Sequence, residues 1–175
     1  MPKISRWRDR PPRRGVEASL RNWLCEPGSL TARLQRSGRF RLQLLRQRLH
    51  CANPDEEDIL GLPSHARCWV REVLLHCNDT PVIFAHTVLP TEPRGVLGRW
   101  FAGLGGRSLG SLLFAHPGFR RGQLAFARID PRHPLYARAA NALGISPPCF
   151  FARRCVHGFG RQRVLVTEVF AAALG

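Results

Sequence analysis

The segment RCWVREVLLHCNDTPVIFAHTVLP, residues 67–90, decides the fold, because it predicts two strands joined by a tight turn. Asn78-Asp79-Thr80-Pro81 supplies the turn: Asn and Asp side chains bond to their own backbone, and proline fixes its φ. The flanks are rich in β-branched, aromatic and other large apolar residues, which suit a half-buried pleated surface. A turn this short favours an antiparallel pair.

One arginine interrupts the first of these strands. Because side chains alternate across a strand, Arg71 shares a face with Trp69, Val73 and Leu75. If that face is buried, the guanidinium needs an anion, since an unpaired buried charge costs several kcal/mol. Two kinds of anion fit the sequence, a carboxylate of the protein or a ligand.

Composition indicates one globular domain with a strong positive charge. The chain has 175 residues, and its hydrophobic fraction of 44% is ordinary for a protein with a core of its own. Lys and Arg number 27 against 12 acidic residues, and Lys3 is the sole lysine. Such a bias is typical of a codon-biased genome, and the basic residues are spread along the chain rather than clustered with aromatics. We therefore expect no specific nucleic-acid partner, although the charge would steer small anions towards the protein.

The first 15 residues differ from the rest. They are rich in arginine around Pro11-Pro12, which predicts a poorly ordered basic arm at 1–15 followed by a single domain at 16–175. No apolar segment of a secretory signal follows the basic start. No stretch approaches the ~18 apolar residues of a membrane span. We therefore expect a cytoplasmic protein.

Six cysteines form no C-x-x-C pair, and their spacing matches no zinc pattern. We expect reduced, mostly buried thiols and no metal site. The acidic cluster Asp55-Glu56-Glu57-Asp58 favours the first turn of a helix capped by Asn53 rather than a metal site, because the helix dipole attracts acids there.

Outside the central pair, the pattern predicts four more strands and several short helices. Strands are expected at 39–50, 123–129, 149–156 and 163–170. Residues 16–35 are expected to form two short helices, the second capped by Ser29. Further helices are expected to begin after Asn53 and at Thr91-Glu92-Pro93, and to span 109–114 and 135–143. The glycines at 103–106 separate two short amphipathic helices in the manner of a mobile lid. Without regular βαβ alternation, these elements indicate an α+β domain around an antiparallel sheet.

Glu168 repeats the anomaly of Arg71, because it shares a strand face with Val164, Val166 and Phe170. Periodicity leaves two interpretations open. The two charges either form an ion pair across strands, or lie exposed at a sheet edge, and then have only a structural role. Alternatively they line a mostly apolar pocket, in which Arg71 binds a carboxylate and Glu168 accepts a hydrogen bond or acts as an acid or base.

Five stretches taken together resemble the chorismate lyase (chorismate–pyruvate lyase) family of bacterial ubiquinone biosynthesis. They keep the family's order and approximate spacing: WVREVLL at 69–75, AHTVLP at 85–90, LGSLLF at 109–114, FARR at 151–154 and LVTEVF at 165–170. The resemblance implies a single α+β domain with a six-stranded antiparallel sheet and helical flaps over an enclosed site. It also implies that chorismate is converted to 4-hydroxybenzoate and pyruvate without metal or organic cofactor. We expect a monomer.

The resemblance also assigns residues. Arg71 matches the arginine that binds the ring carboxylate, and Glu168 the acid that faces the hydroxyl or ether end. Leu109 and Leu30 match positions that contact ligand through the main chain. His86 stands where a family member has glycine, so it joins the expected substrate-binding set as a residue that would reshape the pocket. Its strand face, shared with Val82, Phe84 and Val88, is typical of a core histidine instead.

Two rival functions belong to other classes. The chorismate lyase fold also resembles the ligand-binding half of some bacterial transcription regulators, which suggests a non-catalytic sensor of small carboxylates. Those regulators carry a DNA-binding domain in front, for which 15 residues are too few. A nucleic-acid-binding protein would bind with steep salt dependence, and an enclosed Arg71 and Glu168 would then have no purpose.

Overall fold

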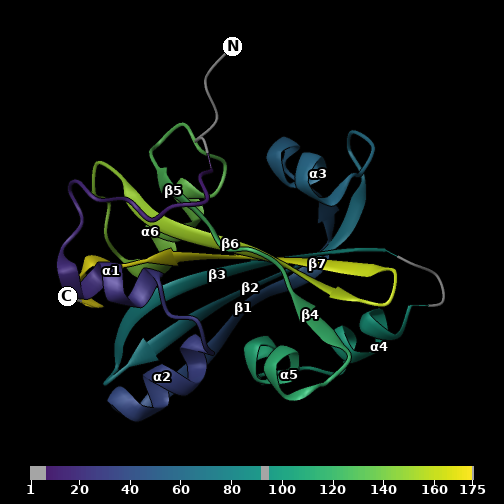
Figure 1. Cartoon of the computed structure of the whole chain (residues 1–175), viewed down its shortest axis with the longest axis horizontal. Coiled ribbons are helices and arrows are strands. Elements are labelled where there is room, and N and C mark those ends of the chain that lie inside the picture. The colour runs from purple at the N-terminus through teal and green to yellow at the C-terminus, as the bar shows by residue number, and fades with distance from the viewer. Residues whose placement is uncertain (1–6, 92–94, 175) are drawn as a thin grey trace.

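The computed structural model describes residues 7–91 and 95–174. In this part of the chain a single antiparallel sheet has seven strands, in the order β1-β2-β3-β7-β6-β4, with β5 also pairing with β6 (Figure 1). The strands are β1 (Phe40–Cys51), β2 (Arg67–Cys77), β3 (Thr80–Pro90), β4 (Phe119–Arg121), β5 (Ala125–Ile129), β6 (Phe150–Phe159) and β7 (Gln162–Phe170). The α+β antiparallel architecture is confirmed. The prediction of six strands is wrong, because it missed β4, whose three residues are too few to show an alternating pattern.

The helices are short and close to their expected positions. They are α1 (Ala18–Leu24), α2 (Leu30–Ser37), α3 (Pro54–Leu60), α4 (Val96–Ala102), α5 (Leu109–Ala115), α6 (Tyr136–Leu143) and the 3₁₀ helix η1 (Ala172–Leu174). Ser29 caps α2 by accepting a hydrogen bond from the Ala32 amide at 3.3 Å. Asn53 and Glu56 form a capping box at α3. Within the predicted helix start at Thr91, Glu92 and Pro93 lie outside the described residues.

The turn between β2 and β3 begins the register of this central strand pair. Asn78 and Asp79 both adopt left-handed backbone angles, with φ of 50° and 65°, as a two-residue hairpin turn requires. The turn pairs Cys77 with Thr80, and a shift of register between Leu75 and His76 then places Arg71 opposite Thr87. On its other edge β3 pairs with β7, and Ala85 lies opposite Glu168. Arg71 and Glu168 therefore lie on the same face, with β3 between their strands.

Helices cover both faces of the sheet (Figure 1). On the Arg71 face, α1 and α2 pack against Leu75 and Phe170, and α4 packs against Leu89 and Val164. The opposite face carries α6, which packs against Phe84 and its neighbours, and α3, whose Leu60 belongs to a smaller apolar cluster. The sheet is thus the middle of three layers.

Part of the predicted basic arm contacts the sheet. Arg8 exchanges two backbone hydrogen bonds with Phe126 of β5, at 2.9 and 2.7 Å, and Trp7 Nε1 donates to Asp55 at 3.0 Å. Residues 1–6 lie outside the described part of the chain. The arm therefore has fixed contacts at Trp7 and Arg8, while a domain boundary at residue 15 stays a prediction.

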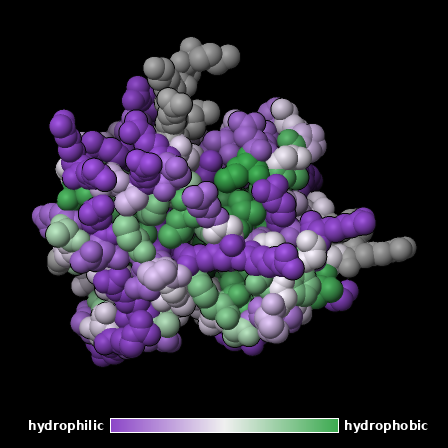
Figure 2. Space-filling view, viewed as in Figure 1, coloured by the Kyte–Doolittle hydropathy of each residue, from purple (hydrophilic) through white to green (hydrophobic). Residues whose placement is uncertain are grey.

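The face of the molecule shown in Figure 2 is mainly hydrophilic. Figure 2 shows charged and polar residues over most of the visible face, with hydrophobic residues between them.

All six cysteines are free, but only Cys68 and Cys155 are buried, so the prediction of mostly buried thiols is wrong. Among the described helices none combines the length and the apolar character needed to span a bilayer.

Candidate active site

A cavity lies between the Arg71 face of the sheet and the N-terminal ends of α2 and α5. It encloses about 660 Å³, counting the space at its opening to solvent. The sheet contributes Leu42, Arg71, Val73, Leu75, Ala85, Thr87, Arg153, Cys155, His157, Val166 and Glu168; the cover contributes residues 29–31, 108–110, Leu113 and Phe114; and Arg121 of β4 completes the wall. A mostly apolar wall with a few convergent polar groups is typical of a small-molecule site. The cavity is open at its mouth, so the expected complete enclosure is not confirmed.

Arg71 provides a fixed positive charge in this cavity. Its side chain is almost fully buried and donates from Nη1 to Gln47 Oε1 at 2.7 Å. Nη2 donates to the carbonyl oxygens of Gly105 and Arg107, at 2.8 and 2.9 Å. Burial lowers the pKa of Arg71, yet an arginine stays protonated at any physiological pH. No carboxylate of the described residues pairs with it, so its charge is available to an anionic ligand.

Glu168 forms an ion pair with Arg153 and not with Arg71. Its Oε2 accepts a hydrogen bond from Arg153 Nε at 2.6 Å. The register explains the pair, since Arg153 lies directly opposite Glu168 across β6 and β7. Arg153 also donates to the carbonyl oxygens of Leu24 and Glu26, at 3.2 and 2.7 Å. The interpretation of Arg71 and Glu168 as one ion pair is therefore wrong, and both side chains line the cavity.

The cover of the cavity brings two distant segments together. Leu30 at the start of α2 and Leu109 at the start of α5 both line the cavity, while the ligand contacts expected of them stay a prediction. Thr31 Oγ1 and Ser108 Oγ lie 2.8 Å apart and join the two helix starts by a hydrogen bond. The loop before α5 is in turn bound to Arg71 through the carbonyls of Gly105 and Arg107. These polar contacts connect the two covering segments to each other and to Arg71.

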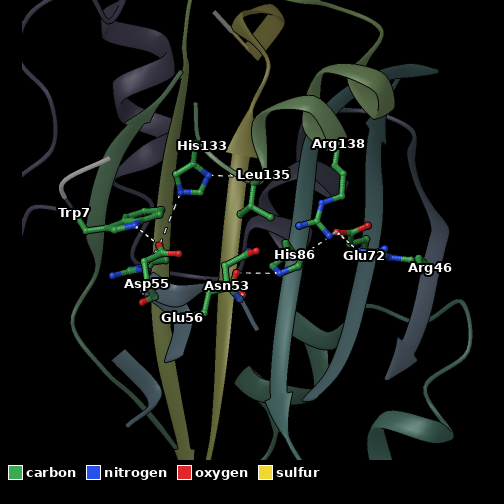
Figure 3. A network of polar contacts seen from close by, with 11 residues as sticks. Trp7, Arg46, Asn53, Asp55, Glu56, Glu72, His86, His133, Leu135 and Arg138 are labelled. Carbon is green, nitrogen blue, oxygen red and sulfur yellow. Dashed lines mark hydrogen bonds and ion pairs between the residues drawn. The ribbon is translucent and has the colours of Figure 1, made fainter. Parts of the chain in front are cut away.

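His86 does not line the cavity. It is buried on the opposite face of the sheet, where Nδ1 lies 2.9 Å from Glu72 Oε1 and Nε2 lies 3.0 Å from Glu56 Oε1 (Figure 3). Alternation along β3 explains this placement, because Ala85 and Thr87 face the cavity and His86 between them cannot. Burial alone would lower the pKa of His86, but the charges of Glu56 and Glu72 outweigh it and raise this pKa. The structure thus corrects the placement of His86 among the substrate contacts.

Among the basic and polar residues of the cavity that sequence reasoning missed as site residues, three lie on β6. Arg153, Cys155 and His157 alternate along β6 on the face that carries Glu168 in β7. Burial, together with the charges of Arg121 and Arg153, lowers the pKa of His157 to about 4. Burial raises the pKa of the Cys155 thiol. Alternation within β6 was the available signal, because it separates Arg153, which faces the cavity, from Arg154, which binds Asp55 on the other face at 2.9 Å.

Comparison with known proteins identifies close relatives. The family model described as "Chorismate lyase" matches residues 1–174, which includes the basic arm. The probable chorismate pyruvate-lyase of Dechloromonas aromatica is 54% identical over 173 residues, which cover 98% of this chain and 97% of the relative. That of Aromatoleum aromaticum is 44% identical over 174 residues, covering 97% and 93%.

Solved structures similar to this chain include a domain of a repressor and an effector domain. The C-terminal domain of the histidine utilization repressor from Pseudomonas syringae has a TM-score of 0.59 and 12% identity, covering 78% of this chain and 94% of that domain. The effector domain of PhnF from Mycobacterium smegmatis has a TM-score of 0.55 and 18% identity, covering 82% and 88%. At these identities the similarity extends to the fold alone.

Proposed function

The chain belongs to the chorismate lyase family, and on that premise we propose that its cavity binds chorismate and releases 4-hydroxybenzoate and pyruvate. The observation that carries this function is the conjunction of a family match along the chain with a cavity that holds an unneutralised, buried arginine. Chorismate is a dianion, and a fixed positive charge in a partly dry cavity attracts such a substrate strongly. The reaction would supply 4-hydroxybenzoate to ubiquinone biosynthesis.

In this proposal Arg71 binds the ring carboxylate. Two of its nitrogens are already oriented by Gln47, Gly105 and Arg107. This arrangement fixes the guanidinium before the substrate arrives, so that little conformational entropy is lost on binding. Leu30 and Leu109, which line the cavity, would contact the ligand from the covering helices.

Glu168 would face the hydroxyl and ether end of the substrate. Its ion pair with Arg153 supports a role as a hydrogen-bond acceptor for the ring hydroxyl, rather than as a proton donor to the ether oxygen. Loss of the enolpyruvyl group makes the ring aromatic, so the reaction is strongly downhill. The protein then needs mainly to fix a reactive conformer and to stabilise charge on the departing oxygen.

Incubation of the purified protein with chorismate and a chelator tests this function directly. We expect 4-hydroxybenzoate and pyruvate to appear in equal amounts, as measured by chromatography. Binding of 4-hydroxybenzoate without turnover would favour the sensor function instead. Neither binding nor turnover would leave only the fold shared with the family.

The remaining expectations concern assembly and location. We propose a monomer, because residues of one chain line the cavity from the sheet and from the covering helices. A cytoplasmic location suits a substrate and two products that are small anions.

A further inference from the structure

A second positive centre lies at the end of the cavity remote from Arg71. Arg121 of β4 lies opposite His157 of β6, and both side chains line the cavity. Arg71 is on β2, and the strand order places β3, β7 and β6 between it and β4. At ~4.8 Å per strand, their Cα atoms are on the order of 19 Å apart. The two long side chains extend into one cavity from opposite sides.

Arg121 is held in place but is not neutralised. Nη1 donates to the carbonyl of Pro27, and the guanidinium lies 5.2 Å from the ring centroid of Phe114. Its Nε is buried and has no hydrogen-bond partner among the residues that the structure describes. A buried donor without a partner is costly, and a bound acceptor would remove that cost.

The neighbours of Arg121 do not supply the missing anion. Glu168, the carboxylate that lines the cavity, is bound to Arg153 at 2.6 Å. His157 adds a neutral ring at neutral pH, because burial and the charges of Arg121 and Arg153 lower its pKa to about 4. Burial is the main cause of this low pKa, and the positive charges of Arg121 and Arg153 add to it.

The substrate of the proposed function has a group that matches this centre. Chorismate carries one carboxylate on its ring and a second on the enolpyruvyl group, which is attached through an ether oxygen. With the ring carboxylate on Arg71, the second carboxylate points to the other end of the cavity. We propose that Arg121, with His157 beside it, is a second anion site that binds the enolpyruvyl carboxylate. This inference rests on the proposed function and adds a residue that holds the leaving group.

The products separate the two sites experimentally. After cleavage, pyruvate carries the carboxylate assigned to Arg121, whereas 4-hydroxybenzoate keeps only the carboxylate assigned to Arg71. We expect Arg121→Gln to lower kcat/KM for chorismate by about 10- to 100-fold, the scale of a charged hydrogen bond. The Kd for 4-hydroxybenzoate, measured by calorimetric titration, should change by less than about twofold. Arg121→Lys, which keeps the charge, should recover part of the loss.

The matched control is Arg120→Gln on the same strand. Arg120 is exposed and pairs with Gly158, so this variant removes an equal charge from the protein but not from the cavity. Its kcat/KM should stay within about twofold of wild type. A comparable loss of kcat/KM in both variants would show that the effect comes from the net charge of the protein. That result would overturn the assignment of Arg121 as a second anion site.

The remaining outcomes distinguish this inference from the proposed function. Turnover by wild type together with unchanged kcat/KM in Arg121→Gln would overturn the second site and leave the lyase function intact. Equal weakening of chorismate turnover and 4-hydroxybenzoate binding would also overturn it, because Arg121 would then have only a structural role. Absence of turnover by the wild-type protein would overturn both the proposed lyase function and the second anion site.

Discussion

At the scale of single residues, Arg71 is distinguished by the kind of groups that hold it. A side-chain amide and two backbone carbonyls satisfy its N–H groups without cancelling its charge. A carboxylate partner would have fixed the side chain equally well, but would have removed the attraction for a ligand. Neutral acceptors therefore let one residue be rigid and still attract anions.

The first prediction concerns this charge. Arg71→Ala should weaken binding of 4-hydroxybenzoate by at least ~2 kcal/mol, because a charged hydrogen bond to the ring carboxylate is lost. The Kd from titration measures the effect. Arg67→Ala, an exposed arginine on the same strand, is the control and should bind as wild type does. An unchanged Kd in Arg71→Ala, with a normal melting curve, would contradict the assignment.

Glu168 carries the second prediction at this scale. If it accepts a hydrogen bond from the ring hydroxyl, Glu168→Gln keeps an acceptor oxygen and should lose less than about 100-fold in kcat, because general acid catalysis contributes ~10²–10⁴. The alkaline limb of the pH–rate profile, where a general acid would lose its proton, should also keep its position. A larger loss together with disappearance of that limb would identify Glu168 as the general acid instead.

At the scale of elements, β3 shows what the sequence could predict. The turn at Asn78-Asp79 and the alternation of apolar residues correctly predicted the pairing of β2 with β3. Alternation also placed Arg71 and Glu168 on faces that the register then brings together. Both predictions depend on local rules of backbone geometry, which can be applied to a single sequence.

The part of the site on β4 and β6 could not be predicted in the same way. β4 has three residues, so Arg121 has too few neighbours to show which face it occupies. Its place beside His157 depends on pairing with a strand that follows about 30 residues later. The pairing of Glu168 with Arg153 rather than Arg71 is likewise a matter of register between strands.

The two faces of β3 give the third prediction. His86→Leu should lower the free energy of unfolding by about 3–5 kcal/mol, because it removes one partner of a buried ion pair. KM for chorismate should nevertheless stay within about twofold of wild type, since the side chain lies on the face away from the cavity. Chemical denaturation and steady-state kinetics measure the two quantities.

A double variant controls for the loss of packing. Glu56→Gln combined with His86→Leu removes both charges of one contact, while the amide oxygen can still cap the Asn53 amide as Glu56 does at 2.8 Å. We expect it to be more stable than His86→Leu alone, because no uncompensated carboxylate remains at residue 56. A large rise in KM in either folded variant would return His86 to the substrate-binding set.

At the scale of the whole molecule, the sheet separates two layers of buried charge. On the α3 and α6 face, acids and bases match one another. Arg46 and Arg138 lie 3.0 Å from Glu72 (Figure 3). Arg154 lies 2.9 Å from Asp55. On the cavity face, positive charges exceed the one carboxylate that lines it. The ion pairs on the α3 and α6 face join these helices and the segment at Trp7 to the sheet. The cavity face instead keeps positive charge that an anionic ligand can neutralise.

This division predicts how stability depends on pH. The pKa of His86 is raised above its ordinary value of 6.5 by Glu56 and Glu72, against the effect of burial. A raised pKa in the folded state means that the stabilisation is fully present below the unfolded pKa and is lost as pH rises through the folded pKa. The pKa values of Glu56 and Glu72 are lowered despite their burial, mainly by His86. Their contribution is therefore present above 4.5 and is lost as pH falls.

The difference in unfolding free energy between wild type and His86→Leu isolates the histidine. We expect this difference to be largest near about pH 6, where the carboxylates are ionised and the imidazole is protonated, and to shrink as pH rises towards about pH 9. Denaturant titrations at several pH values measure it, and groups that titrate equally in both proteins cancel. The effect of His157 on stability has the opposite pH dependence. Because its pKa is lowered, its burial destabilises the folded protein only as the pH falls into the acid range. A difference that stays constant or grows with pH would show that His86 stabilises the fold as a neutral ring, through packing rather than through its charge.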